Sequence, residues 1–534
     1  MSDRLVSSPG GLRVASIFAS SMVLQRHTSV PIWGWARPGE TITVRFAGQV
    51  KTAAADATGR WLVALDTRDA GGPFVMTVAG RDHALRLDDI AVGEVWLASG
   101  QSNMEWPVSD AADGPREITA ADRPQIRLFT VNRTKADEPR EDVIGTWRRC
   151  SPATVGPFSA VGYFFARELH DVLGVPIGII NASWDGSRAE AWTPCDTLAA
   201  DPDLEVILER AGREMAEYAR DPDHYEELRA QWKVDVRRAE TEGRPRPCKL
   251  DLPIKPWSRH RPGCLFSGMV APLVSLAIKG VIWYQGEANT HRADEYRQLF
   301  PTLIRSWRAR WGQGEFPFLF VQLANYAPRH QRHRIGTDRA ITSKDSDWAR
   351  LREAQMHALA EPKTGMAVAV DVGDAFDIHP KNKQDVARRL ALAAQAVAYD
   401  LPVIHSGPMY DSMTIAGHKV ILTFTHIGRG LCAKAEPLAG FAIAGVDRRF
   451  VPAYAVIRGT SAEVWSPQIA APVAVRYAWH PNPRCDLYNR DGLPAPPFRT
   501  DDWPRATGSR RPSIQSVLIP SAGGVPRPES CNRS

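Results

Sequence analysis

The stretch Gly93-Glu-Val-Trp-Leu-Ala-Ser-Gly-Gln-Ser-Asn-Met-Glu-Trp106 joins a short apolar run to a small polar turn. Residues 95–98 predict a buried strand, and residues 99–103 predict the turn at its carboxyl end. An open α/β sheet places its chemistry just beyond the carboxyl ends of its strands. Ser102 is therefore the first candidate nucleophile, and Gln101 beside it is a further candidate site residue.

Apolar runs and helical patterns alternate on the carboxyl-terminal side of this stretch. Near-continuous apolar strands that alternate with helices are typical of a parallel sheet covered on both faces. The pattern therefore predicts an α/β domain. The expected strands cover residues 95–98, 175–181, 280–284, 316–323 and 365–372, and the expected helices cover residues 161–172, 269–277, 295–311, 351–359 and 385–399.

The two flanks of this α/β pattern are rich in short strand-like runs. Such runs, separated by Gly, Pro and Asp turns, favour small β modules. We expect an N-terminal β-sandwich-like module over 12–90, the α/β domain over 91–400 and a C-terminal β module over 401–502. Within the α/β domain, a charged helical insertion is expected over about 200–245. Its charges favour a solvated face, and a lid or a partner surface is the alternative.

The composition limits the classes of protein that this chain can belong to. Its 534 residues, 44% hydrophobic and 24% charged, predict a globular chain of more than one domain, with a disordered tail over 503–534. The net charge of +6 is spread along the chain, which argues against a nucleic-acid partner. No window is long and apolar enough to span a membrane. Seven widely spaced cysteines form no zinc-binding pattern, and no nucleotide loop is present, so no metal or other cofactor is expected.

The N-terminus shows no continuous apolar region of the kind found in secretory signals. The cytoplasm is therefore the default compartment, and a periplasmic or secreted location is the alternative if a signal was removed. The sequence does not indicate an oligomeric state.

The candidate base for Ser102 is His379, in a loop that follows the predicted strand at 365–372. A serine hydrolase needs a base within hydrogen-bond reach and a group that orients that base. Asp377 is the nearest acid in the sequence, and Asp374 and Asp371 are alternatives. A Ser–His dyad without a carboxylate also remains open.

Two further polar loops follow predicted strands and offer groups for an oxyanion site. Gly186 lies in the loop after strand 175–181, and its backbone N–H is a candidate donor. In the loop after strand 280–284, Gln285 offers side-chain donors and Gly286 allows close backbone approach. Glu287 and Asn289 are expected to organise that loop through hydrogen bonds.

At these residues the chain resembles the sialate O-acetylesterase family within the SGNH hydrolases. The resemblance rests on Val95-Trp-Leu-Ala-Ser-Gly-Gln-Ser-Asn-Met-Glu105, Gly280-Val-Ile-Trp-Tyr-Gln-Gly-Glu-Ala-Asn289 and Asp377-Ile-His-Pro-Lys-Asn-Lys383. It extends over roughly residues 12–502. It implies a flavodoxin-like SGNH domain that hydrolyses O-acetyl esters on sugars through an acyl-serine.

The resemblance implies that Ser102 is the nucleophile and His379 the base, with Gly186 and Gln285 in loops that shape the oxyanion site. Two positions depart from the family pattern. Phe376 occupies the place, three residues before the histidine, where SGNH enzymes usually carry Asp, and Asp185 replaces the first Gly of Trp-Gly-Gly. Arg188 is the candidate partner of a sialate carboxylate.

An O-acetylated sugar or glycan is therefore the expected partner, and sialic acid is the first substrate. An acetylxylan-type carbohydrate acetylesterase on the same fold is the alternative enzyme. A non-catalytic glycan-binding protein is the alternative from another class.

Overall fold

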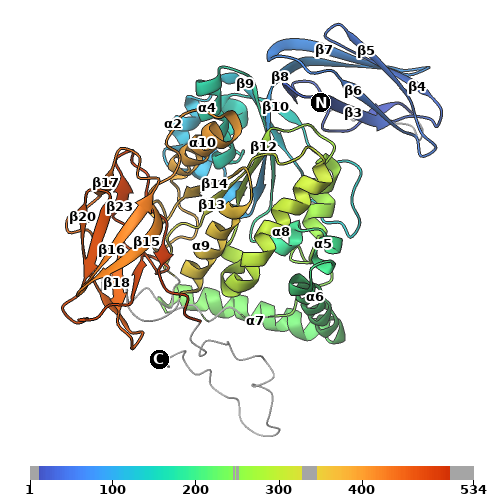
Figure 1. Ribbon diagram of the computed structural model, residues 1–534. Coiled ribbons are helices and arrows are strands. Elements are labelled where there is room, and N and C mark those ends of the chain that lie inside the picture. The colour runs from blue at the N-terminus through green and yellow to red at the C-terminus, as the bar shows by residue number, and fades with distance from the viewer. Residues whose placement is uncertain (1–10, 245–246, 248–249, 251, 328–345, 505–534) are drawn as a thin grey trace. The chain divides into compact units, whose positions relative to one another are not determined.

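The computed structural model describes residues 11–504, apart from 245–246, 248–249, 251 and 328–345 (Figure 1). The tail that the sequence predicts to be disordered therefore lies, from residue 505 onward, outside the described residues. The chain divides into two compact units. The first contains the residues up to Arg210 and Trp257–Thr500, and the second contains Ala211–Pro256 and the segment that begins at Asp501.

The first unit is built around a sheet in the order β10-β9-β11-β8-β12-β13-β14. Its six strands from β9 to β14 are parallel, and β10 pairs antiparallel with β9 at one edge. The strands are β8 (Ala84–Gly100), β9 (Arg123–Thr130), β10 (Trp147–Cys150), β11 (Ile177–Ser183), β12 (Gly280–Tyr284), β13 (Phe318–Gln322) and β14 (Thr364–Val368). The α/β class with a parallel sheet, expected from the alternating pattern, is confirmed.

Helices cover both faces of this sheet, as two tryptophans show. Trp96 of β8 contacts Phe165 and Tyr399, whereas Trp283 of β12 contacts Phe300. Because Gly280 is the partner of Trp96 in register, Trp283 points to the opposite face. The pair α4 (Ala160–Leu173) and α10 (Lys383–Tyr399) therefore covers one face, and α8 (Ala293–Trp311), which packs against α9 (Asp347–His357), covers the other.

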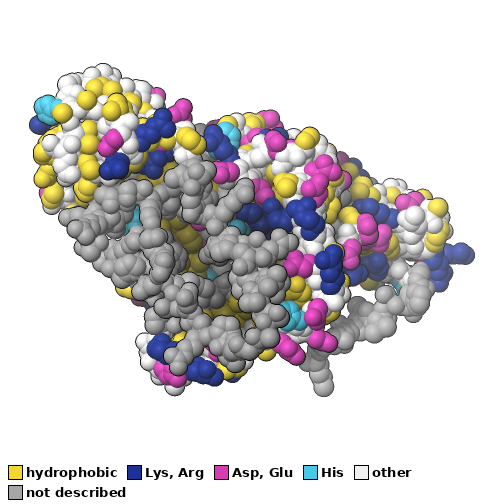
Figure 2. All heavy atoms as spheres, turned by 90° about the horizontal axis from the view of Figure 1, so that it is seen from below, with side chains coloured by type: hydrophobic (Ala, Val, Ile, Leu, Met, Phe, Trp, Pro, Cys, Tyr) yellow, Lys and Arg dark blue, Asp and Glu magenta, His cyan; other side chains and the backbone are white. Residues whose placement is uncertain are grey.

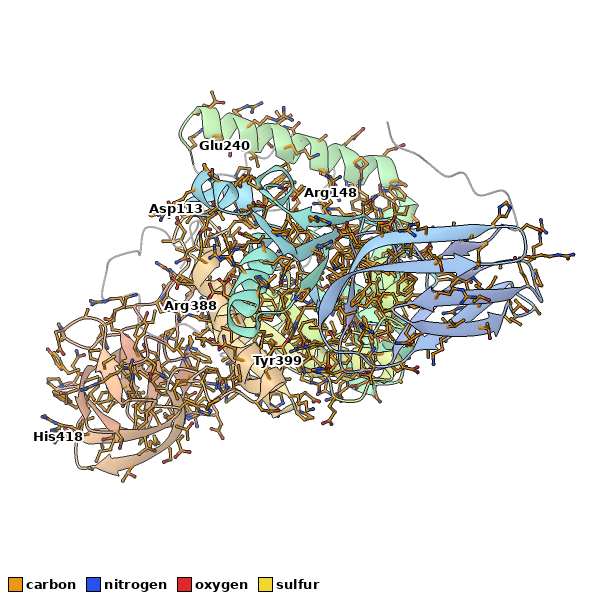
Figure 3. The ribbon with its side chains drawn as sticks, turned by 90° about the horizontal axis from the view of Figure 1, so that it is seen from above. Asp113, Arg148, Glu240, Arg388, Tyr399 and His418 are labelled. Carbon is orange, nitrogen blue, oxygen red and sulfur yellow. The ribbon has the colours of Figure 1, made fainter. Side chains whose placement is uncertain are left out.

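The labelled Tyr399 marks the C-terminal end of α10 (Figure 3). Its hydroxyl lies 3.1 Å from Nε1 of Trp96, which fixes that end of the helix on the sheet. This helix begins directly after the loop that carries His379, so its anchoring also fixes one end of that loop.

The N-terminal module shares a strand with the α/β domain. Strand β8 runs without interruption for 17 residues, so the position expected as a boundary, between 90 and 91, lies inside it. Its first half pairs with β2 (Val23–Gln25) and β7 (Gly71–Ala79), and β7 pairs with β4 (Thr41–Phe46), which pairs with β5 (Gln49–Ala54). A separate sheet contains β1 (Arg13–Val14), β3 (Val30–Trp35) and β6 (Arg60–Leu65).

The C-terminal module is all β, as the sequence predicts. One sheet has the order β15-β16-β21-β20, and a second has the order β19-β18-β22-β24. The strands are β15 (Met409–Ala416), β16 (Lys419–Thr425), β17 (Leu431–Ala433), β18 (Phe441–Ala444), β19 (Phe450–Pro452), β20 (Tyr454–Arg458), β21 (Ser461–Trp465), β22 (Ala474–Tyr477), β23 (Leu487–Asn489) and β24 (Phe498–Arg499). Buried Arg352 of α9 attaches this module by donating to the carbonyls of His480 and Pro481.

The charged segment near 200–245 is helical, as its pattern predicts. Helices α5 (Cys195–Ala199), α6 (Pro202–Arg220) and α7 (Pro222–Thr241) follow one another, and α7 belongs to the second unit. The expectation of a helix over 269–277 is wrong. The chain there forms a π-helical turn at Phe266–Val270 and a 3-10 turn at Ala271–Leu273, because Pro272 has no N–H to continue a regular helix.

Lys and Arg side chains are interspersed with Asp and Glu over the face that Figure 2 shows. Among the residues that the structure describes, no helix is long and apolar enough to cross a membrane.

Candidate active site

Ser102 lies at the carboxyl end of β8, in the first turn of the short helix α1 (Ser102–Glu105). Gly100 makes this sharp exit from the strand possible. Its φ is 137°, and a Cβ there would lie 2.2 Å from the carbonyl oxygen of Tyr284 on the adjacent strand. Only glycine tolerates that approach. The strand end therefore fixes where the hydroxyl of Ser102 is presented.

His379 reaches Ser102 from the loop after β14, although two strands separate β14 from β8 in the sheet. Its Nε2 lies 2.9 Å from Oγ of Ser102. The imidazole stacks on Trp106, with ring centres 4.9 Å apart and an interplanar angle of 19°. Asn103 holds the loop by donating to the carbonyl of Ile378 at 3.0 Å. The serine and histidine expected from the sequence are thus brought into hydrogen-bond contact.

Asp377 lies nearest to His379 among the three acids that the sequence left open. Its Oδ1 accepts the backbone N–H of His379 at 2.9 Å and lies 3.6 Å from Nδ1 of the ring. The second distance is longer than a hydrogen bond. The carboxylate is also 51% exposed, so it acts on the imidazole through a weak, solvated contact.

The other two acids have different partners. Buried Asp371 forms a bidentate ion pair with Arg389, at 2.6 and 2.7 Å, and accepts the hydroxyl of Tyr488. Asp374 accepts the backbone N–H groups of Phe376 and Asp377, which shapes the turn before the histidine. Both acids therefore build the loop, and neither of them orients the ring of His379.

Two unused backbone N–H groups indicate an oxyanion site near Ser102. The loop after β11 is drawn against the strand end because Trp184 donates its N–H to the carbonyl of Gly100 at 3.0 Å. Gly186 in that loop has a φ of 61°. Within the described part of the chain, the N–H groups of Ser102 and Gly186 donate to no protein acceptor. These two unused donors can stabilise the negative charge that develops on an oxyanion near the candidate nucleophile.

Gln101 and Gln285 are used inside the protein. Oε1 of Gln101 accepts the N–H groups of Gly286 and Ala288, each at 3.3 Å, and therefore does not cap helix α1. The amide nitrogen of Gln285 donates to the carbonyl of Ser187 and to Oδ1 of Asn289, at 3.2 and 2.7 Å. Because both of its N–H groups have acceptors, Gln285 supports the loops and is not placed as an oxyanion donor.

Glu190 and Arg292 form a buried ion pair behind these loops. Nη2 of Arg292 lies 2.6 Å from Oε1 of Glu190, and Asn289 donates to the other oxygen at 2.8 Å. Burial acts to raise the pKa of Glu190, but Arg292, Arg188 and the hydrogen bond from Asn289 together lower it to about 2. The positive charge of Arg188 thus favours the charged form of this internal carboxylate.

A second buried network lies under the serine and the histidine. Nζ of Lys383 donates to Oδ1 of Asn103 at 2.5 Å, and Nδ2 of Asn103 donates to Oε1 of Glu287 at 2.5 Å. Burial lowers the pKa of Lys383 to about 7, against the opposing charges of Glu287 and Asp377. Burial also raises the pKa of Glu287, although Asn103 and Lys383 favour its charged form.

These surroundings favour the neutral imidazole. Burial lowers the pKa of His379, and the positive charge of Lys383 lowers it further, whereas Asp377 and Asp185 act to raise it. A histidine that is neutral at neutral pH and hydrogen-bonded to a serine hydroxyl can act as a general base. This chemistry needs no metal, and the described residues contain no group of three His, Cys, Asp or Glu side chains that could hold one.

Comparisons with known proteins identify the family. Residues 253–395 match the model of a family of carbohydrate esterases described as sialic acid-specific acetylesterases. The sialate O-acetylesterase of Mus musculus is 31% identical, over 91% of this chain and 94% of the mouse protein. The human sialate O-acetylesterase is 30% identical, over 91% of this chain and 92% of the human protein. This chain belongs to the sialate O-acetylesterase family.

A solved structure supports the same conclusion. A carbohydrate acetylesterase from Xanthomonas citri is 40% identical and aligns with a TM-score of 0.77, over 92% of this chain and 100% of the other. The family resemblance, the α/β fold with flanking β modules, and the assignment as a carboxylic ester hydrolase are thereby confirmed.

Sequence reasoning did not single out three residues of this esterase site. Asn103 and Lys383 stand inside the quoted motifs, so their positions were visible but their burial and mutual contact were not. Arg259 lies beside Gly186, and no local pattern pointed to it. For Asn103 and Lys383, the available signal was their location inside a family motif. For Arg259, only the tertiary structure shows that it lies near the site.

Proposed function

We propose that this chain is a serine esterase that removes O-acetyl groups from sialic acid or related acetylated sugars. One observation carries the proposal: Oγ of Ser102 lies 2.9 Å from Nε2 of His379 at the carboxyl edge of the sheet, in a member of the sialate O-acetylesterase family. A serine hydroxyl paired with a neutral imidazole is the arrangement that activates a serine nucleophile.

The reaction follows from the positions of these groups. His379 takes the proton of Ser102 as the serine oxygen attacks the acetyl carbonyl carbon. The carbonyl oxygen becomes an oxyanion that accepts the N–H groups of Ser102 and Gly186. The C–O bond to the sugar then breaks, and His379 returns its proton to the sugar oxygen. Water hydrolyses the acetyl-serine with His379 again as base, and acetate leaves.

A broader carbohydrate acetylesterase is the second candidate. The solved relative at 40% identity is described by its carbohydrate class and not by sialate. In addition, Asp185 introduces a carboxylate, 57% exposed, into the loop that carries Gly186. That charge lies next to a proposed oxyanion donor, so acetylated neutral sugars such as acetylated xylan belong in the same test.

The decisive experiment measures acetate release from O-acetylated sialic acid, acetylated xylan and p-nitrophenyl acetate. Ser102→Ala should reduce kcat by about 10⁴-fold or more on every substrate that the parent hydrolyses, because the acyl-enzyme cannot form. Ser109→Ala is the matched control, since Ser109 is exposed and, among the described residues, its hydroxyl bonds to Asp110 next to it. It should retain parental kcat.

Each outcome decides between the functions. Loss of activity in Ser102→Ala alone establishes the serine esterase, and the ranking of the two sugar esters chooses between the two candidates. Substantial activity in Ser102→Ala would mean that another group is the nucleophile. A parent that binds acetylated glycan but releases no acetate from any substrate would instead be a glycan-binding protein.

A further inference from the structure

A guanidinium group lies beside the loop that carries Gly186, one of the two proposed oxyanion donors. Arg259 packs against Gly186, so close that a Cβ on that glycine would lie 3.0 Å from Nη2 of the arginine. Gly186 is one of the two residues with a free N–H beside Ser102. A substrate whose acetyl group reaches Ser102 therefore places the adjoining part of its sugar near Arg259.

Within the described part of the chain, no acceptor lies within hydrogen-bond distance of this guanidinium. Among the described residues, the nearest acid is Asp185, whose Oδ2 lies 3.7 Å from Nη2, which is longer than a hydrogen bond. The Nε of Arg259 is buried without a partner, although the side chain as a whole remains 36% exposed. A guanidinium that is partly exposed and makes no hydrogen bond to the described residues is a candidate for an external acceptor.

Neighbouring arginines differ in this respect. Arg133 is bonded to Glu105, and Arg261 is bonded to Asp137. Arg188 lowers the pKa of the buried Glu190. Arg133 and Arg261 thus have carboxylates of the chain within hydrogen-bond distance, whereas among the described residues the guanidinium of Arg259 has only the longer contact with Asp185.

We propose that Arg259 binds the carboxylate of an acidic O-acetylated sugar and thereby makes the enzyme prefer sialate esters over neutral ones. The inference rests on the proposed esterase function and assigns its specificity. A planar guanidinium matches a carboxylate through two parallel hydrogen bonds. The carboxylate of sialic acid is the group that neutral acetylated sugars lack, so this contact separates the two candidate substrate classes.

Asp185 opposes this contact. It is the nearest competing counterion, and it repels a substrate carboxylate that approaches Arg259. An exposed ion pair at this distance contributes little, so a bidentate substrate displaces it. Removing the charge of Asp185 should therefore strengthen binding of the acid, while removing the charge of Arg259 should weaken it.

The test compares O-acetylated sialic acid, its methyl ester and p-nitrophenyl acetate. Arg259→Gln should raise KM for the acid by about tenfold to hundredfold, and leave kcat/KM for the methyl ester and p-nitrophenyl acetate within about twofold. Arg259→Lys should lie between, because it keeps the charge but loses the fork. Arg86→Gln, an exposed arginine on the N-terminal half of β8, is the matched control and should change nothing.

Binding can be measured apart from catalysis. By calorimetry, Ser102→Ala should bind O-acetylated sialic acid more tightly than the Ser102→Ala, Arg259→Gln double variant. Adding Asp185→Asn to Ser102→Ala should tighten binding of the acid. The methyl ester should show neither change.

The results that would overturn the role of Arg259 differ from those that would overturn the proposed esterase function. Equal losses on all three substrates in Arg259→Gln, or a parent that treats the acid and its methyl ester alike, overturn the role of Arg259 while the esterase stands. A parent active on p-nitrophenyl acetate through Ser102 but inactive on O-acetylated sialic acid overturns both this role and the sialate substrate. A parent with no Ser102-dependent activity, whose binding is unaffected by Arg259→Gln, overturns the esterase and this inference together.

Discussion

Two buried carboxylates lie behind the candidate active site, and each is linked to a cation and an asparagine. Glu190 bonds directly to Arg292 at 2.6 Å and also accepts from Asn289. Oε1 of Glu287 accepts from Asn103, and among the described residues its second oxygen is buried without a partner. In the part of the chain that the structure describes, no ion pair joins Glu287 to Lys383, whose ammonium group bonds to Asn103 instead.

The difference in contact produces opposite electrostatics. Direct pairing with arginine overcomes the effect of burial and keeps Glu190 charged, with a pKa of about 2. Bridging through an amide does not overcome it, so the pKa of Glu287 is raised and that of Lys383 falls to about 7. Arginine keeps its charge when buried, whereas lysine readily shifts its pKa. The first network is a structural clamp, and the second can respond to pH beneath His379.

The largest effect should come from breaking the clamp. Arg292→Met leaves the carboxylate of Glu190 buried without its closest cation, which should lower the free energy of unfolding by about 3–5 kcal/mol. Glu295 loses a weaker contact at 3.4 Å but keeps Arg210 at 2.8 Å. Denaturant unfolding of parent and variant measures the loss.

Glu190→Gln combined with Arg292→Met is the matched control. Because both charges are then removed, the double variant should be more stable than Arg292→Met alone. A single variant that unfolds like the parent would show that the clamp does not hold Glu190.

An intermediate effect should come from the second network. Lys383→Met removes a positive charge that opposes protonation of His379, so the pKa of that histidine should rise. A base must be neutral to act, so the acid limb of kcat/KM should move to higher pH. Lys383 is itself protonated below about pH 7, where His379 takes up its proton. For Lys383→Met we expect kcat/KM to fall about tenfold on the acid limb and about twofold on the alkaline plateau.

The pH profile with p-nitrophenyl acetate makes this measurement. Lys381→Met is the matched control, since its side chain is exposed in the same loop, and it should keep the parental profile. Lys383→Arg keeps the charge and should leave the limb in place. A loss by the same factor at every pH would assign Lys383 a structural role only.

The sequence indicated the local pieces of this architecture well. Residues 280–284 form a strand with the predicted bounds. The flanking modules contain the short strands expected there, because Gly, Pro and Asp turns delimit their runs; among them are 30–35, 41–46, 60–65 and 419–425. Strand β5 was not identified, since it is exposed and its residues Gln49–Ala54 form no apolar run. Periodicity also could not show that β8 continues through two modules, because its two halves have different burial patterns.

The candidate site divides in the same way. Ser102 and His379 were identified because both follow predicted strands and lie within long motifs. Such motifs can be recognised without any knowledge of the fold. Contacts across the sheet have no such signal. A lysine in a predicted loop is expected to be solvated, so the burial of Lys383 could not be predicted from its neighbours in the sequence. Arg259 lies next to Gly186 only because of the tertiary structure. Neither the burial of a side chain nor the order of strands in the sheet can be predicted from the local sequence.

The smallest effect separates the exposed acid from the buried ones. Asp377→Asn should lower kcat by less than about tenfold, whereas loss of a buried triad aspartate costs about 10⁴-fold in serine proteases. Because its carboxylate is half exposed and 3.6 Å from Nδ1, solvent already shares the task of stabilising the imidazolium. Losing that negative charge should lower the pKa of His379, so the acid limb should move to lower pH, opposite to Lys383→Met. A loss near 10⁴-fold would instead make Asp377 a full triad member, whose contact with the ring shortens when substrate binds.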